Sequence, residues 1–258
     1  MNTNIKVTSL ASSSKGNAYH IKCGQTEILI DAGISATSIR NSLMDTGSSL
    51  NNISAVFITH EHTDHVKGLE GLSKLRLDLP VHITKPSADE YMRKHTYPLN
   101  IIVHDINYLC NIGDVTVRSF YSSHDSLACV GYTVEYKDDK IGIATDLGYV
   151  DKCTVNALKG CNSVILESNY DEKKLMNGTY PPDLKMRIKS PKGHLSNYDC
   201  AAFALYLAQN GTKNFLLAHL SQENNTPDIA LNITSRALKD FDDVVIKVAS
   251  VNAPTYLC

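Results

Sequence analysis

The segment VFITHEHTDHVKG, residues 56–68, concentrates side chains that bind metal ions. His60, His62, Asp64 and His65 fall within six positions. Imidazole nitrogens suit zinc, iron and similar ions, and a carboxylate oxygen widens the choice towards manganese. Four such ligands exceed what one tetrahedral site takes from one loop once ligands from elsewhere in the chain join it. The segment therefore predicts a metal site. The plainer alternative is a solvated loop that happens to be rich in histidine.

The elements on either side of this segment explain how it could present its side chains together. A buried strand, SAVFIT, precedes the loop and ends where the chain curls. Beyond the strand end, His60 and His62 can point the same way. Asp64 and His65 stand at the head of a helix predicted over residues 66–78, where the positive end of the helix dipole favours an anion.

The remaining elements are predicted from hydrophobic periodicity and turn residues. Apolar or alternating runs predict further strands at residues 4–10, 17–23, 26–33, 81–84, 115–120, 129–136, 140–146, 163–168 and 214–220. Helices are predicted at residues 35–44, 152–159, 199–210 and 227–238. Strands and helices thus alternate along much of the chain, which is typical of an α/β protein.

Two parts of the chain resemble each other in pattern. EILIDAG is followed by a helix and VFITHEHTD, and IGIATDLG is followed by a helix and SVILESNYD. A duplicated half of this kind predicts two sheets packed face to face with helices outside, an αββα sandwich. The alternative is that apolar strands simply look alike. No low-complexity linker divides the 258 residues, so we expect one domain spanning 1–258.

Charge, cysteine content and hydrophobic segments limit the cellular location and the partners that we expect. Net charge is −2, which argues only mildly against a nucleic-acid substrate because a local groove can still be positive. Seven cysteines without a C-x-x-C pair fit reduced thiols. The N-terminal segment lacks the apolar core of a signal peptide, and no stretch approaches a membrane span. We therefore expect a cytoplasmic protein without a membrane partner.

The H-x-H-x-D-H pattern at the end of a buried strand resembles the metallo-β-lactamase superfamily. ILIDAG, SSHD, ATDLG and LLAHLS resemble further motifs of that superfamily, in the same order. The resemblance implies the αββα four-layer sandwich and seven metal ligands in two sets. One ion would take His60, His62 and His124, the other would take Asp64, His65 and His219, and Asp146 would bridge them. Asp31 would orient a ligating imidazole, although a helix cap is an alternative role.

Two ligand positions separate this chain from relatives with other chemistry. Di-iron members that reduce oxygen carry a glutamate where this chain has His62. The best-known β-lactamases carry a cysteine where this chain has Asp146. A bridging carboxylate and two full ligand sets suit phosphodiester hydrolysis, in which two ions hold the attacking and leaving oxygens. We expect two divalent ions, zinc or manganese, with iron as a third choice.

The stretch between Asp146 and His219 resembles the nuclease branch that includes tRNase Z and RNase J. SSSKGNA, THEHTDHVKG, YPPDLKMRI before GHLSN, and AHLSQENN together resemble the YycJ/WalJ-like family of small bacterial metallohydrolases. The resemblance implies a nuclease, with 5′-to-3′ exonuclease action on DNA. His194 would then assist the leaving oxygen, and Asp64 would orient or deprotonate the attacking water.

Substrate contacts are predicted at two places. Lys15 and Asn17, in the SSSKGN loop, are expected to hold a phosphate, as are Lys185 and Arg187 in the basic run before His194. An ordinary turn and a solvated loop are the alternatives. The partner would be nucleic acid, DNA in particular, and the oligomeric state stays open. His20, His82, His95 and His104 fit no ligand pattern and are expected to be structural or surface residues.

Two other functions remain open. One is a small-molecule hydrolase of the same fold that acts on a cyclic phosphodiester or a thioester. The other is a non-catalytic regulatory protein that binds metal. The GHLSN motif and the basic run disfavour the first, and the complete ligand set disfavours the second.

Overall fold

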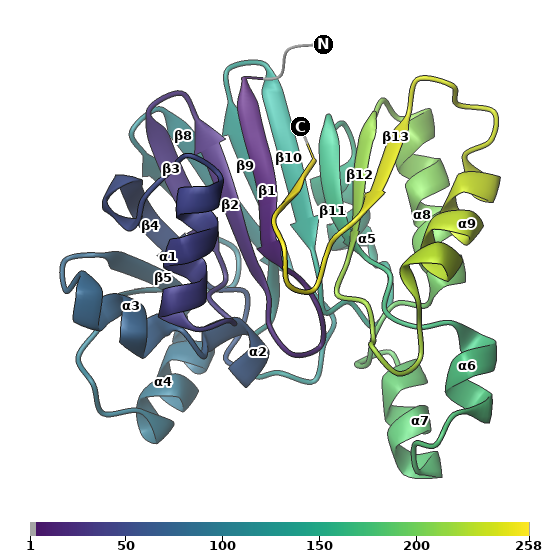
Figure 1. The fold of residues 1–258 in the computed structure, drawn as a ribbon, viewed down its shortest axis with the longest axis horizontal. Coiled ribbons are helices and arrows are strands. Elements are labelled where there is room, and N and C mark those ends of the chain that lie inside the picture. Colours follow the sequence, from purple (N-terminus) through teal and green to yellow (C-terminus); the bar gives the residue numbers. More distant parts are fainter. Residues whose placement is uncertain (1–3, 258) are drawn as a thin grey trace.

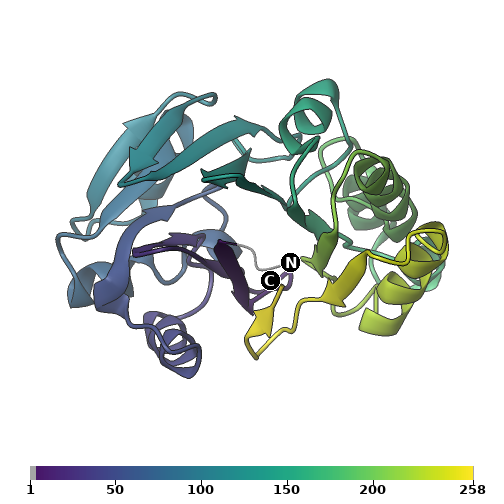
Figure 2. The same ribbon diagram turned by 90° about the horizontal axis from the view of Figure 1, so that it is seen from above.

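The structure, a computed structural model, describes residues 4–257. Two seven-stranded sheets pack face to face, and helices cover their outer faces (Figures 1 and 2). This arrangement confirms the predicted αββα sandwich.

The first sheet has the strand order β14-β1-β2-β3-β4-β5-β6. Antiparallel pairing joins β1 to β2, β2 to β3 and β14 to β1, whereas β3 to β6 run parallel. The strands are β1 (Ile5–Ala11), β2 (Ala18–Cys23), β3 (Thr26–Ile30), β4 (Ile53–Phe57), β5 (Pro80–Thr84), β6 (Asn100–His104) and β14 (Thr255–Tyr256). On the outer side lie α1 (Ala36–Asp45), α2 (Thr63–Val66), α3 (Leu69–Leu75) and α4 (Lys85–Lys94). A 3₁₀ turn at Leu50–Asn52 leads from α1 into β4.

The second sheet has the strand order β13-β12-β11-β10-β9-β8-β7. Strands β10 to β13 run parallel, and β7 to β10 pair antiparallel. The strands are β7 (Leu109–Ile112), β8 (Val115–Tyr121), β9 (Val130–Tyr136), β10 (Asp139–Ala144), β11 (Ser163–Glu167), β12 (Asn214–Ala218) and β13 (Val245–Val248). Helices α5 (Lys152–Leu158), α8 (Asn197–Gln209) and α9 (Pro227–Ala237) lie on its outer side, and α6 (Glu172–Asn177) and α7 (Pro182–Lys189) project beyond the strand ends (Figure 1).

The main hydrophobic core lies between the two sheets. Tyr19, Phe57 and Tyr132 are among its largest fully buried side chains, and Ile143 and Leu216 pack in the same cluster. Burial of these side chains holds the two sheets against each other, because removing apolar surface from water is the main stabilising contribution to folding. The carboxyl ends of the parallel strands of both sheets therefore meet along one edge, at the bottom of Figure 1.

One predicted helix is divided in the structure. The helix expected over residues 66–78 is interrupted after α2 and resumes as α3. The reason is a close approach at Gly68, whose N–H donates to the carbonyl of Ala32 at 2.7 Å. A Cβ on Gly68 would lie 2.3 Å from the carbonyl oxygen of Ile34, so the chain turns here to pack against residues 32–34.

Several elements of the structure were not predicted from the sequence. These are strands β6, β7, β13 and β14 and helices α4, α6 and α7, and the basic run, for which a solvated loop was the alternative, forms helix α7. None of the residues of α7 is fully buried. Within residues 4–257, no helix has the length and apolar character required to cross a membrane.

Candidate metal centre

The predicted ligands follow the ends of strands from both sheets. The loop with His60 and His65 follows β4, Asp146 follows β10, and His219 follows β12. Asp31, Asp146 and His219 have backbone φ angles of 61°, 57° and 54°. The left-handed conformation costs a non-glycine residue on the order of 1–3 kcal/mol, and such residues cluster at functional sites. Strain at three residues of one edge marks that edge as the candidate site.

The structure brings the seven predicted ligands together. His60, His62 and His124 offer nitrogens within 4.8 Å of one another, as do the ligand atoms of Asp64, His65 and His219. Asp146 falls within the same limit of His60 and His65, between the two sets. These are the groupings that the family resemblance implied, and a further one, of Asp146 and His219 with Glu167 and His194, was not among them.

Three buried imidazoles turn the same nitrogen away from the centre. Each places Nδ1 next to an oxygen that can only accept a hydrogen bond, so each Nδ1 carries a hydrogen and leaves Nε2 for the centre. The pairs are His65 with Asp31 Oδ2 at 2.8 Å, His219 with Glu167 Oε1 at 2.7 Å, and His124 with the carbonyl of Gly193 at 3.1 Å. Asp31 thus has the orienting contact that the resemblance implied, and it also accepts from the backbone N–H of Thr59 at 2.8 Å.

When the imidazoles are neutral, the atoms that face the centre are acceptors held close to other acceptors, and Asn17 Nδ2 also lies 3.3 Å from His65 Nε2. His65 Nε2 lies 3.1 Å from Asp146 Oδ2 and 3.5 Å from Asp64 Oδ2, and His219 Nε2 lies 3.4 Å from the same oxygen of Asp64. Lone pairs at these distances repel unless a cation lies among them. Burial lowers the pKa of His65, but Asp146, Asp31 and Asp64 outweigh burial and raise it well above its ordinary value. A metal ion must therefore displace protons here.

The environment of His60 indicates that a metal ion, rather than extra protons on the histidines, balances the charge at this centre. Burial and the neighbouring charge of His65 hold the pKa of His60 well below its ordinary value. Its Nδ1 lies 3.0 Å from Thr59 Oγ1, and its buried Nε2 has no hydrogen-bond partner among residues 4–257. A neutral imidazole with an unpartnered buried nitrogen suits a metal ion. The residues present therefore fit divalent metal ions.

Glu167, at the end of β11, was not predicted as a site residue. Its Oε1 accepts from Nδ1 of His194 at 2.9 Å and from Nδ1 of His219 at 2.7 Å, and its Oε2 accepts the backbone N–H groups of Leu147 and Leu195. Burial raises the pKa of this carboxyl, but the His194 charge and the histidine hydrogen bonds outweigh it and lower the pKa. A glutamate that closes an apolar strand was the available signal, because glutamates are rarely buried unless paired.

His194 stands beside the predicted ligands and faces a cavity. Its ring centroid lies 5.1 Å from that of His124 and 5.3 Å from that of His219, and its Nδ1 is 3.8 Å from Asp146 Oδ1. Burial lowers the pKa of His194, whereas Glu167 raises it, and the net direction is upward. Its side chain is 22% exposed, so it can meet a substrate.

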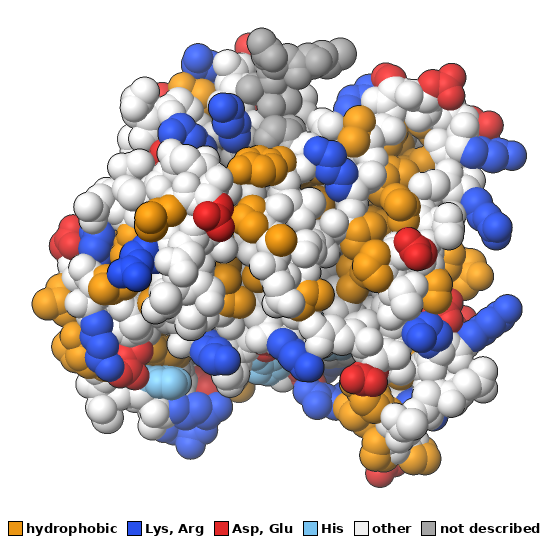
Figure 3. Space-filling model, viewed as in Figure 1, with side chains coloured by type: hydrophobic (Ala, Val, Ile, Leu, Met, Phe, Trp, Pro, Cys, Tyr) orange, Lys and Arg blue, Asp and Glu red, His pale blue; other side chains and the backbone are white. Residues whose placement is uncertain are grey.

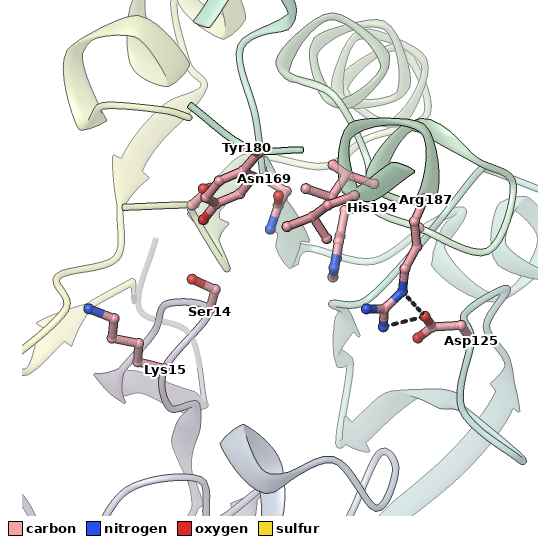
Figure 4. A pocket seen from close by; sticks show the side chains of 11 residues that line it. Ser14, Lys15, Asp125, Asn169, Tyr180, Arg187 and His194 are labelled. Atoms are coloured by element: carbon pink, nitrogen blue, oxygen red, sulfur yellow. Dashed lines mark hydrogen bonds and ion pairs between the residues drawn. The ribbon is translucent and has the colours of Figure 1, made fainter. Parts of the chain in front are cut away.

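The cavity has a volume of about 410 Å³ and is lined by residues of both halves of the chain (Figure 4). Arg187 lies at one side, where its guanidinium pairs with Asp125 at 2.5 Å. Lys15 lies at the other side, with His194 between them. Asp125 was also missed from the sequence, although it directly follows the predicted ligand His124.

Two predicted substrate contacts do not reach the cavity. Asn17 is fully buried, its Nδ2 donates to the carbonyl of Ser13, and its Oδ1 accepts from Ser12. Lys185 directs its ammonium group to the backbone carbonyls of Met176 and Gly178, at 2.9 and 2.8 Å. Both side chains therefore stabilise the structure around the site, and neither is among the residues that line the cavity.

The SSSKGN loop, residues 12–17, is joined directly to the predicted ligands. The backbone N–H of Asn17 donates to the carbonyl of Asp64, and the backbone N–H of His219 donates to Ser12 Oγ, both at 2.8 Å. The loop therefore borders the site, and these bonds hold Lys15 at the rim of the cavity.

The other four histidines lie outside this site. His20 pairs with Glu27 at 2.9 Å, His82 contacts His104 at 2.9 Å, and His95 stacks on Tyr91. Each has a partner within its own part of the fold, as expected of structural residues.

Gly33 offers a test of how closely the site depends on its backbone. A Cβ at this position would lie 1.6 Å from the carbonyl oxygen of Asp64. Gly33→Ala is therefore expected to displace Asp64, to weaken Mn²⁺ binding at least about tenfold, and to destabilise the fold by about 1–3 kcal/mol. Calorimetric Mn²⁺ titration and thermal unfolding would measure both effects. An alanine variant with the affinity and melting temperature of the parent would show that Asp64 is not held by this contact.

Comparison with known proteins agrees with this geometry. Residues 26–220 match the β-lactamase superfamily domain. The chain is 33% identical over 233 residues to the exodeoxyribonuclease YycJ of Bacillus anthracis, and this match covers 90% of the chain and 88% of that relative. The chain belongs to the metallo-β-lactamase superfamily.

A second relative supports the same family, and a solved structure supports the fold. The exodeoxyribonuclease WalJ of Streptococcus pneumoniae is 33% identical over 229 residues, which cover 87% of the chain and 85% of that protein. The metallo-β-lactamase fold protein YhfI of Bacillus subtilis has a TM-score of 0.74 at 15% identity, over 98% of this chain and 99% of that one. As a member of this superfamily, the protein is a metal-dependent hydrolase.

Proposed function

We propose that this metallo-β-lactamase protein is a nuclease that uses two divalent ions, with exonuclease action on DNA in the 5′-to-3′ direction. The observation that carries the proposal is His194, which lines the cavity next to the predicted metal ligands and is hydrogen-bonded to the buried Glu167. The two 33% identical relatives, both exodeoxyribonucleases by name, support the choice of DNA.

The metal ions would occupy the two sets of ligands. His60, His62 and His124 would hold one ion, Asp64, His65 and His219 would hold the other, and Asp146 would contact both. Zinc or manganese suits this mixture of nitrogen and carboxylate ligands, with iron as a third choice. When bound, two ions would stabilise charge on the attacking and leaving oxygens and favour hydroxide near neutral pH.

The protein's own residues would move the protons. Asp64 is partly exposed, at 24% of its side chain, and would orient or deprotonate the attacking water. His194 donates its Nδ1–H to Glu167, and a second proton on Nε2 would pass to the leaving oxygen. Glu167 favours the doubly protonated imidazole because it raises the pKa of His194 against the effect of burial. A general acid is thereby placed next to the reacting phosphate.

Positive charge at the rim would hold the phosphate backbone. Figure 3 shows a hollow along the lower edge of the molecule, with lysine, arginine and histidine side chains around it. Lys15 and Arg187 line the cavity from opposite sides of His194. Local charge of this kind can bind nucleic acid although the net charge of the chain is −2.

A small-molecule hydrolase remains the second candidate, because a cavity of about 410 Å³ could also enclose a cyclic phosphodiester. A thioester is disfavoured, since its hydrolysis does not require basic residues for a phosphate backbone. A purely regulatory protein is disfavoured because His194 lines the cavity next to the full set of predicted ligands, where it could act on a bound substrate.

A substrate panel would separate these functions. Protein loaded with Mn²⁺ would be incubated with end-labelled DNA, end-labelled RNA, a cyclic nucleotide, a thioester and bis(p-nitrophenyl) phosphate. We expect stepwise shortening of DNA and slower turnover of the p-nitrophenyl diester. Cleavage confined to the cyclic nucleotide or the thioester would replace the nuclease with a small-molecule hydrolase, and no turnover with any substrate would support a regulatory role.

A further inference from the structure

Glu61 lies between the predicted ligands His60 and His62, and other parts of the chain engage both of its carboxylate oxygens. The residue is buried, with 9% of its surface exposed. Its Oε2 accepts a hydrogen bond from Ser87 Oγ at 2.7 Å, and its Oε1 accepts one from the backbone N–H of Leu127 at 3.1 Å. Among the described residues, the clusters that could hold a metal ion do not include Glu61. Two donors therefore fix a buried carboxylate that is not itself a predicted ligand.

The two donors belong to different halves of the sandwich. Ser87 is a fully buried residue of α4, which lies on the first sheet. Leu127 lies in loop 122–129, between β8 and β9 of the second sheet, and the same loop carries the predicted ligand His124. Glu61 therefore ties this loop to the metal-binding segment that follows β4.

The tip of loop 122–129 depends on this carboxylate for its position. Two other hydrogen bonds join the loop to the first sheet at its far end, from Thr84 Oγ1 to the carbonyl of Ala128 at 3.2 Å and from the N–H of Val130 to the carbonyl of Thr59 at 3.1 Å. Leu127 itself is 63% exposed, so burial of its side chain does not anchor the tip. The bond to Glu61 holds the part of the loop that lies between these contacts and His124.

His124 has to meet ligands that come from the other sheet. Its Nε2 lies 3.4 Å from His62 Nδ1, and its ring centroid lies 5.1 Å from that of His60. Ligand nitrogens of one zinc ion lie about 2 Å from the metal, so the nitrogens of this set must stay close together. A shift of loop 122–129 would move His124 out of this set.

The second set of predicted ligands is fixed independently. The backbone N–H of His219 donates to Ser12 Oγ, and the backbone N–H of Asn17 donates to the carbonyl of Asp64, both at 2.8 Å. Neither bond involves Glu61 or loop 122–129. A change at Glu61 should therefore affect one set of ligands and spare the other.

We propose that Glu61 is a positioning residue, which holds His124 in place for the ion that His60, His62 and His124 would bind. The inference rests on the proposed function, in which two ions occupy the two sets of ligands. Glu61 contacts neither ion and acts through the backbone of loop 122–129.

Glu61→Ala is expected to weaken one Mn²⁺ binding event by about 10–100-fold, the usual cost of removing a partner that orients a ligand, and to leave the other at parental affinity. Calorimetric titration of metal-stripped, full-length protein with Mn²⁺ would measure both affinities. EPR spectra recorded with two equivalents of Mn²⁺ should show a coupled pair of ions in the parent and isolated ions in the variant. A general loss of stability would weaken both binding events and would not produce this selectivity.

Three further variants serve as controls. Glu61→Gln should keep most of the parental affinity, because its amide oxygen can accept from Leu127 and its amide N–H can donate to Ser87. Ser87→Ala leaves the metal-binding segment intact and should weaken the same binding event to a smaller extent, which provides the test if Glu61→Ala does not fold. Glu70→Ala, a change at an exposed glutamate of α3 that pairs with Lys74, is the matched control and should bind both ions as the parent does.

A second substitution identifies the ion that remains in Glu61→Ala. Adding His219→Ala should remove the remaining binding event, because His219 belongs to the other set of ligands. Adding His62→Ala should leave that event unchanged.

Two parental affinities in Glu61→Ala, equal weakening of both, or a remaining ion that is lost with His62→Ala would overturn the role of Glu61. Parental binding in Ser87→Ala would overturn it if Glu61→Ala does not fold. A parent that binds a single ion has a different meaning: the proposed two-ion centre would then be wrong, and the inference would fail with it.

Discussion

Replacing His194 by alanine is expected to lower the turnover of DNA by about 10²–10⁴-fold while the metal content stays at the parental level. Three clusters join the seven predicted ligands without His194, which belongs to a fourth cluster with Asp146, Glu167 and His219. Its Nδ1 is bonded to Glu167 at 2.9 Å. Removal of the imidazole therefore takes away a proton donor and leaves both sets of ligands in place. Steady-state kinetics on labelled DNA and elemental analysis of the same preparations would check the two parts.

The leaving group supplies an internal control for this variant. p-Nitrophenolate departs without a proton, so His194→Ala should lose much less activity on bis(p-nitrophenyl) phosphate than on DNA. His95→Ala is a matched control, because His95 stacks on Tyr91 away from the site. A His194→Ala variant that is depleted of metal, or that cuts DNA at the parental rate, would contradict the assignment of His194 as a general acid.

Asp146→Asn should differ from His194→Ala, because we expect it to lose bound metal as well as activity. The Asp146 carboxylate lies among the ligands of both predicted ions, with Oδ2 3.1 Å from His65 and Oδ1 3.5 Å from His124. The amide keeps the shape and tolerates the φ angle of 57°, but it removes the negative charge that the cations need. Because the loss of an outer partner alone costs about 10–100-fold in metal affinity, we expect at least that loss here.

Calorimetric titration with Mn²⁺ would measure this effect, with Asp138→Asn, a change in the exposed turn before β10, as the control. Parental Mn²⁺ affinity in Asp146→Asn would rule out a bridging role for this carboxylate. His219→Ala is expected to lose metal affinity as well, since its Nε2 faces Asp64 within one ligand set.

The parts of the site that follow strand ends could be predicted from the sequence. The loop after β4 carries four ligands within six residues, and this pattern by itself predicted a metal site. Asp146 and His219 also follow apolar strands, but their place at the site was predicted from the resemblance to the metallo-β-lactamase superfamily. The short spacing of ligands and their position directly after an apolar strand are local properties, so both can be recognised in the sequence.

The parts that depend on contacts between distant segments could not be predicted. Glu167 joins His194 and His219 through hydrogen bonds across 27 and 52 positions of sequence, and nothing local indicates those partners. Lys185 looked like a phosphate ligand, but helix α7 turns its ammonium group towards the carbonyl groups of Met176 and Gly178. Helix α7 has no fully buried residue, and its apolar spacing is limited to Leu184 and Ile188, too short a pattern to identify a helix.

The most direct test of a two-metal nuclease is a titration of metal-stripped protein with Mn²⁺, with the initial rate of cleavage of a 5′-phosphorylated DNA strand measured at each ratio of metal to protein. The ligand clusters around His60 and His219, joined by Asp146, predict no cleavage without metal and a rate that rises until two equivalents per chain are bound. A rate that reaches its plateau at one equivalent, or DNA left intact at every ratio, would contradict the account.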